Sequence, residues 1–174
     1  RAVAQARKFG VEILSPQEVT RLHVEDEYKV VTFRDEKTVS AKALVIATGV
    51  QWRVLDVPGL ERFTGAGVYY GSSMAEARTC RNETVYIVGG ANSAGQAALN
   101  FAQFATRVVM LVRGGSLAAS MSEYLIKEIG RHPRIEVQTD TCVVGADGKD
   151  RLQCLQLART STGEQRAVEA TSLY

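Results

Sequence analysis

The residues best suited to chemistry lie in a glycine-rich stretch over residues 85–102, VYIVGGANSAGQAALNFA. This stretch matches in part the spacing G-x-G-x-x-G/A, which binds the pyrophosphate of a dinucleotide between a strand and a helix. Gly89 takes the first position, where a glycine allows the tight turn, and Ala94 takes the third, where a small residue allows close packing. Ala91 takes the second position and adds a methyl group where the backbone must approach the phosphates.

A helix that begins at this turn would offer free N–H groups and its positive dipole end to the phosphates. Asn92 and Ser93 could cap that helix or donate hydrogen bonds to the ligand. The alternative is an α/β turn that binds nothing. The position between a predicted strand and a predicted helix favours the nucleotide site. Its candidate residues are Gly89, Gly90, Ala91, Asn92, Ser93 and Ala94.

The end of the next predicted strand bears on the choice of nucleotide. An NAD site usually has an acidic residue about 20 residues after the turn, where it binds the ribose 2′-hydroxyl. Here the sequence reads VVMLVRGGS, with Arg113 and Ser116 and no acid. A guanidinium can bind the 2′-phosphate of NADP in a bidentate manner. We therefore expect NADP(H) rather than NAD, although Arg113 could also be a solvated strand end.

The elements around the turn alternate between strand and helix. Apolar runs predict parallel strands, small-residue and amphipathic runs predict helices, and a final pair of runs predicts antiparallel strands. This order is typical of an α/β fold, a Rossmann-like doubly wound parallel sheet with antiparallel strand additions. The strands are expected at 85–88, 107–113, 135–140, 142–147 and 151–160, and the helices at 93–105 and 121–132.

The first 51 residues have a different pattern of predicted elements. A helix is expected over residues 1–9, a short strand over 11–14, and a hairpin from the alternating runs 18–25 and 28–35. The continuous apolar run ALVIATG, residues 43–49, predicts a strand buried on both faces. Residues 52–66 lack a sustained period and contain Pro58-Gly59, which indicates a linker.

Composition excludes several classes of protein. The chain has 174 residues, 45% of them hydrophobic, and a net charge of +2, so it can bury a core and has no basic stripe for nucleic acid. No apolar run reaches the ~20 residues of a membrane span. The three cysteines, Cys80, Cys142 and Cys154, are few and far apart, which favours a reducing, cytoplasmic setting and excludes a zinc site.

Three segments of the chain resemble thioredoxin reductase and related flavoproteins that bind two dinucleotides. VIATGVQWRVLDVPG is similar to the crossing from the flavin domain to the nicotinamide domain. GAGVYYGSSMAEA is similar to the start of the NADPH domain, and VYIVGGANSAGQAA to its nucleotide turn. The resemblance implies that residues 1–51 are the C-terminal part of an FAD-binding domain segment and that residues 67–174 are the NAD(P)H-binding domain.

The resemblance also implies cofactors and partners. NADPH would pass hydride to FAD, and FAD would be held only in the longer protein, where Thr48 and Gly49 would contact it. The resemblance does not decide the electron acceptor, which could be a dithiol protein, a small-molecule disulfide, a ferredoxin or oxygen. No nucleic acid or membrane partner is expected. The protein could form a homodimer.

One departure from the family concerns the redox disulfide. Members that reduce thioredoxin carry a C-x-x-C pair early in the NADPH domain, where this chain has Gly71, Ser72, Ser73 and Met74. A dithiol relay needs two thiols close enough to bridge. A non-catalytic NADP-sensing module that has lost the relay is therefore the alternative to an enzyme.

Overall fold

The structure is a computed structural model that describes residues 2–49, 53–71 and 74–174. It divides into two compact units, Arg1–Val50 and Gln51–Tyr174, here called the N-terminal and C-terminal units. None of the helices in the described residues is long and apolar enough to cross a membrane.

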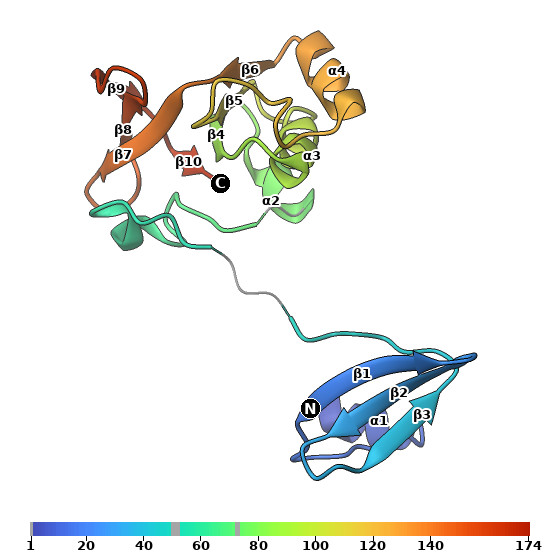
Figure 1. Cartoon of the computed structure of the whole chain (residues 1–174). Coiled ribbons are helices and arrows are strands. Elements are labelled where there is room, and N and C mark those ends of the chain that lie inside the picture. Colours follow the sequence, from blue (N-terminus) through green and yellow to red (C-terminus); the bar gives the residue numbers. More distant parts are fainter. Residues whose placement is uncertain (1, 50–52, 72–73) are drawn as a thin grey trace. The chain divides into compact units, whose positions relative to one another are not determined.

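The N-terminal unit is a helix and a small antiparallel sheet (Figure 1). Helix α1 covers Ala2–Lys8, and the strands are β1 (Val19–Glu25), β2 (Tyr28–Phe33) and β3 (Thr38–Ala41) in the order β1-β2-β3. The expected hairpin is confirmed, because Glu25 pairs with Tyr28 and Asp26 takes a positive φ of 50° in the turn.

Two predictions for this unit were wrong. Residues 11–14 form no strand, and a cis Ser15–Pro16 bond follows them. Residues 43–49 form no strand either, and Val45 and Ile46 are 88% and 68% exposed. A strand buried on both faces needs paired neighbours and two covering layers. The described residues of the chain supply neither for this segment.

The C-terminal unit contains the parallel sheet, which confirms the predicted α/β fold. Its order is β10-β4-β5-β6, with all neighbouring pairs parallel. Helices α2, α3 and α4 lie on one side of this sheet, and the antiparallel sheet β7-β8-β9 lies on the other (Figure 1). The elements are α2 (Met74–Thr79), β4 (Thr84–Val88), α3 (Asn92–Phe101), β5 (Arg107–Leu111), α4 (Glu123–Arg131), β6 (Ile135–Gln138), β7 (Thr141–Asp147), β8 (Cys154–Arg159), β9 (Gln165–Glu169) and β10 (Ser172–Leu173).

Two apolar cores hold these layers together. On the helical side, the fully buried Phe101, Met110 and Leu125 come from α3, β5 and α4. On the other side, Leu111 packs in one cluster with Leu155 and Leu157 of β8. Each central strand therefore has apolar side chains on both faces, which explains the continuous apolar runs of β4 and β5.

The segment expected as a linker, residues 52–66, contributes to the second core. It contains the short 3₁₀ helix η1 (Leu60–Phe63). Leu60 and Phe63 are each 1% exposed and belong to the cluster of Leu111. This segment buries side chains although its sequence has no hydrophobic periodicity, because an irregular segment can bury single residues that are not regularly spaced.

The sequence did not predict β9 and β10. Strand β10 joins the parallel sheet beside β4 through the pairs Ser172–Val85 and Leu173–Tyr86. The Ser172 hydroxyl also donates to the Glu83 carboxylate at 2.8 Å. Strand β10 has only two residues, too few to show a periodic pattern in the sequence. Its pairing with β4 is therefore seen only in the structure.

Candidate functional site

The glycine turn connects β4 to α3 at the carboxyl edge of the parallel sheet. Gly89 has φ +146°, in the region that favours glycine, and a Cβ there would lie 3.0 Å from the Cβ of Ala94. A Cβ on Gly90 would lie 2.8 Å from a methyl group of Val112. The two glycines thus let the chain turn tightly between α3 and the end of β5.

Ala91 is the N-cap of α3, with φ −98° and ψ 177°. This is extended backbone that any L-residue adopts, so the second position needs no glycine for its conformation. Ala91 is also exposed. Its methyl group therefore adds bulk at the surface of the turn without straining it.

The start of α3 leaves several amide groups unused by the helix. The Gly95 N–H donates to the carbonyl of the N-cap residue Ala91 at 3.1 Å. The first amides of any helix have no partner within it, which here concerns Asn92, Ser93 and Ala94. Together with the helix dipole they form a donor group suited to a phosphate.

The segment after β5, residues 113–122, lies against this turn. The Ser120 hydroxyl donates to the Gly90 carbonyl at 2.9 Å. The Ser122 N–H and hydroxyl both donate to the Asn92 amide oxygen, at 2.8 and 3.1 Å. Asn92 was predicted from the sequence but Ser120 and Ser122 were not, because hydrogen bonds between residues 30 positions apart leave no local pattern.

Arg113 stands at the base of the same segment and is exposed, as is Ser116. The Thr160 hydroxyl donates to the Arg113 carbonyl at 3.1 Å, and the Asp140 N–H donates to the Gly114 carbonyl at 3.0 Å. The Ser116 hydroxyl accepts from the Ala118 N–H at 3.0 Å. Thr160 and Asp140 thus hold the start of this segment, while Ser120 and Ser122 hold its end against the turn.

An acid that the sequence analysis missed stands near Arg113. The hydroxyls of Ser161 and Thr160 donate to the Asp140 carboxylate, and these bonds hold the pKa of that carboxyl below its usual value. Asp140 therefore stays ionised and is already engaged by two donors from the β8–β9 turn. It follows β6 rather than β5, which is why a search about 20 residues after the turn did not find it.

Two cavities border the turn and share Val88 and Tyr174. One, of about 400 Å³, is also lined by Ser93 and Ala94. The other, of about 390 Å³, is also lined by Gly89, with Tyr69 and Tyr70 among its walls. Tyr69 stacks on Tyr174 with ring centroids 5.1 Å apart. A planar ring or a ribose could therefore lie against aromatic surface beside the phosphate donors.

Tyr174 also contacts the nearest thiol. Its hydroxyl lies 3.5 Å from Cys80 Sγ. Burial, aided by the hydrogen bond with Cys80, raises the pKa of Tyr174 well above its ordinary value, so the phenol stays protonated. Cys80 is 3% exposed, which makes this thiol inaccessible to a protein substrate.

The other two thiols form no pair. All three cysteines are free. In the register of β7 and β8, Cys142 lies opposite Ala158 and Cys154 lies opposite Asp147. Of the segment where the family resemblance implied a C-x-x-C pair, Ser72 and Ser73 lie outside the described residues. The described thiols therefore provide no dithiol relay.

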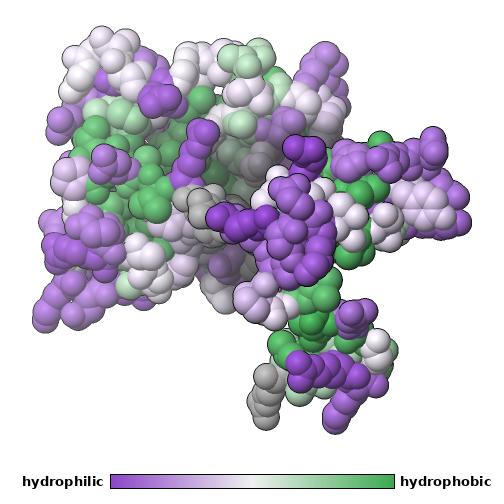
Figure 2. Space-filling model, turned by 60° about the horizontal axis from the view of Figure 1, so that its bottom comes forward, coloured by the Kyte–Doolittle hydropathy of each residue, from purple (hydrophilic) through white to green (hydrophobic). Residues whose placement is uncertain are grey.

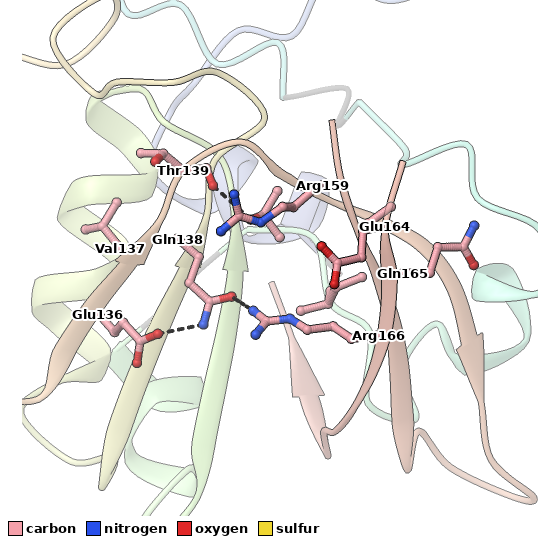
Figure 3. A pocket seen from close by; sticks show the side chains of 11 residues that line it. Glu136, Val137, Gln138, Thr139, Arg159, Glu164, Gln165 and Arg166 are labelled. Atoms are coloured by element: carbon pink, nitrogen blue, oxygen red, sulfur yellow. Dashed lines mark hydrogen bonds between the residues drawn. The ribbon is translucent and has the colours of Figure 1, made fainter. Parts of the chain in front are cut away.

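A third cavity, of about 550 Å³, lies between β6 and the β8–β9 pair (Figure 3). Its polar side chains bind one another: Arg166 donates to Gln138, and Gln138 donates to Glu136, each at 2.6 Å. A hydrogen bond from Arg107, followed by that from Gln138, lowers the pKa of Glu136. None of the residues predicted for the nucleotide site lines this cavity, and we assign it no ligand.

Thr48 and Gly49 belong to the N-terminal unit and lie in an irregular segment. Both are exposed, and Gly49 has φ +77°. Among the described residues there is no cluster of three or more His, Cys, Asp or Glu side chains that could hold a metal ion.

Comparison with known proteins identifies the family. Residues 2–173 match the sequence profile described as pyridine nucleotide-disulphide oxidoreductase. The chain belongs to this family. It is 30% identical over 171 residues to a thioredoxin reductase of Streptomyces clavuligerus, covering 98% of this chain and 52% of that protein. It is 28% identical over 175 residues to a thioredoxin reductase of Yarrowia lipolytica, covering 98% and 54%.

Solved structures of this pyridine nucleotide-disulphide oxidoreductase family share the fold. The thioredoxin reductase of Giardia duodenalis superposes with a TM-score of 0.77 at 24% identity, over 99% of this chain and 55% of that one. That of Streptococcus pyogenes gives 0.68 at 26% identity, over 98% and 55%. The chain thus spans about half the length of the relatives it matches, and the family resemblance and fold expected from the sequence are confirmed.

Proposed function

We propose that the C-terminal unit binds NADP(H) at the Gly89–Ala94 turn and serves a flavoprotein oxidoreductase. The observation that carries this proposal is the strand–turn–helix unit with Gly89 at φ +146° and no side-chain cap at the start of α3, whose first amides have no partner within the helix. Membership of the pyridine nucleotide-disulphide oxidoreductase family supports it independently. Arg113 is the proposed contact for the 2′-phosphate, with Ser116 as an additional donor.

When bound, NADPH supplies a hydride and a flavin accepts it, so the chain itself contributes binding and orientation. The amides at the start of α3 would hold the pyrophosphate. The cavity lined by Gly89, Tyr69 and Tyr70 would keep water from the ring that lies in it. The residues present therefore fit a pyridine nucleotide.

The N-terminal unit is proposed as part of the flavin-binding domain, with Thr48 and Gly49 at the cofactor. Among its described residues only Val30 is buried. In the space-filling view of the whole chain in Figure 2, apolar side chains in green lie at the surface among hydrophilic ones in purple. Within the N-terminal unit, Phe9 and Val45 are 84% and 88% exposed. Such apolar surface is suited to contact with further protein. We propose that the remainder of the flavin domain covers it.

The electron acceptor is proposed to receive electrons from the flavin rather than from a dithiol in this chain. The sequence has no C-x-x-C pair, and Cys80 is buried. The same observation favours one alternative: a module that binds NADP(H) without passing electrons. The two proposals agree on the nucleotide site and differ in redox activity.

The deciding experiment uses a longer protein that contains this chain and the remainder of the flavin domain. Anaerobic addition of NADPH should abolish the visible absorbance of the flavin as it is reduced. The matched Gly89→Val variant should retain its flavin and bleach much more slowly. A flavin that stays oxidised while NADPH binds would overturn the enzyme and support the sensing module.

A further inference from the structure

The glycine turn is tied to the segment after β5 by a small group of polar residues, here called the clip: Asn92, Ser120 and Ser122. Its three hydrogen bonds join the start of α3 to the residues that precede α4. Nothing in the proposed pyrophosphate binding requires them, since the donors to the pyrophosphate are main-chain amides. The clip therefore needs an explanation of its own.

The segment that the clip holds is anchored at two places. At its base, the Arg113 carbonyl accepts from Thr160, and the Gly114 carbonyl accepts from Asp140. At its far end, Ser122 donates twice to the Asn92 amide oxygen. Between these anchors, residues 113–116 are exposed. The clip thus fixes the distal end of a loop whose open part carries the proposed 2′-phosphate contacts.

Apolar packing places the same segment against the turn but is less directional. A Cβ on Gly95 would lie 2.9 Å from the Met121 side chain, and one on Gly90 would lie 3.7 Å from Leu117. These contacts leave little space between α3 and the segment. Methionine is flexible, however, and such contacts do not set an orientation. Hydrogen bonds do, because their strength falls steeply with angle.

We infer that Asn92 is a positioning residue for nucleotide choice: through Ser122 it holds the 113–122 segment in the geometry that reads the 2′-phosphate. This rests on the proposed NADP(H) site. Asn92 acts through its side-chain oxygen, which accepts both bonds, so a carboxylate at this position would hold the segment equally well. An alanine would release it.

The experiment measures the dissociation constants of NADPH and NADH for the chain and its variants. Asn92→Ala should weaken NADPH by about threefold to tenfold, as expected for lost hydrogen bonds, and NADH by much less, because NADH lacks the 2′-phosphate. Asn92→Asp should restore most of the NADPH/NADH ratio, since the pyrophosphate next to the new charge is common to both nucleotides and only the more distant 2′-phosphate differs. Ser122→Ala keeps the backbone bond and should lie between wild type and Asn92→Ala.

A second readout follows the clip without nucleotide. Asn92→Ala should speed hydrogen exchange of the Ser122 amide, which loses its acceptor, whereas Asn92→Asp should not. Gln103→Ala removes another exposed amide side chain, just beyond the end of α3, and serves as the matched control with no change in either readout. Circular dichroism confirms that each variant is folded.

The outcomes separate this inference from the function on which it rests. If the folded wild-type chain binds neither nucleotide, the proposed function is wrong and the inference falls with it. If wild type prefers NADPH and Asn92→Ala keeps that preference, only the inference is overturned. Equal weakening of both nucleotides by Asn92→Ala, without rescue by Asn92→Asp, also overturns it, because the residue would then support the fold rather than selectivity.

Discussion

At the scale of single residues, the turn shows which positions of the glycine pattern depend on backbone conformation. Gly89 has φ +146°, a backbone conformation that residues other than glycine rarely adopt. Ala91 has an extended backbone, which any residue can adopt. The sequence alone identified the turn but could not show that Ala91 is unstrained. It also could not reveal the bonds of Asn92, because these depend on how α3 and the β5–α4 segment pack.

The first prediction at this scale concerns Arg113. Replacing it with alanine removes a charge-assisted contact with the 2′-phosphate, which is worth roughly 1.5–3 kcal/mol, or about tenfold to a hundredfold in affinity. Arg113→Ala should therefore weaken NADPH far more than NADH. Arg113→Glu should reverse the preference, because its carboxylate repels the phosphate and accepts from the ribose hydroxyl.

Calorimetric titration with both nucleotides measures this effect. Arg159→Ala is the matched control, since Arg159 is another exposed arginine of the same unit that lines the cavity at β6 rather than the turn. An equal loss for both nucleotides in Arg113→Ala, or no loss at all, would show that another group reads the 2′-phosphate.

At the scale of elements, local patterns predicted those that are long and periodic. The β4–α3–β5–α4–β6 order and the β7–β8 pair follow from apolar runs and amphipathic periods, and the structure has them. The patterns failed where an element depends on a distant partner. Strand β10 exists because β4 has a free edge, and residues 43–49 form no strand because the described chain offers them no neighbour.

The return of β10 to the sheet depends on Gly67, whose carbonyl accepts from the Leu173 N–H at 2.8 Å. Gly67 has φ +123°, and a Cβ there would lie 2.4 Å from the Leu152 Cβ. Gly67→Ala should lower the free energy of unfolding by about 2–4 kcal/mol, because it adds both overpacking and backbone strain. Urea denaturation measures the loss.

Gly130→Ala is the control for this change. Gly130 lies in α4 with open space around the added methyl group, and its φ is not positive. The substitution should be neutral or stabilise the unit by about 0.5–1 kcal/mol, as alanine favours helices. Similar stability for Gly67→Ala and wild type would show that β10 tolerates a different path of the chain.

At the scale of the whole molecule, the two units differ in how well they are packed. The C-terminal unit has an apolar core on each side of its parallel sheet. The N-terminal unit buries only Val30 among its described residues and exposes Phe9, Val45 and Ile46. The sequence pattern changes between these two parts, but composition alone could not show which apolar side chains are exposed.

Limited proteolysis of the 174-residue chain tests this difference. Because few buried contacts resist local opening, trypsin should degrade residues 1–50 first and leave a resistant fragment that begins near the exposed Arg53. Mass spectrometry identifies the fragment. Survival of the N-terminal unit for as long as the C-terminal unit would show that its exposed apolar surface does not limit its stability.

The most direct test of the nucleotide site is calorimetric titration of the chain with NADPH, compared with Gly89→Val and Ala91→Gly. We predict that wild type binds, that Ala91→Gly binds equally or slightly more tightly, and that Gly89→Val, shown to be folded by circular dichroism, loses binding. Valine cannot take φ +146° at this turn without strain and would crowd the pyrophosphate. No binding by wild type, or equal binding by folded Gly89→Val, would contradict the account.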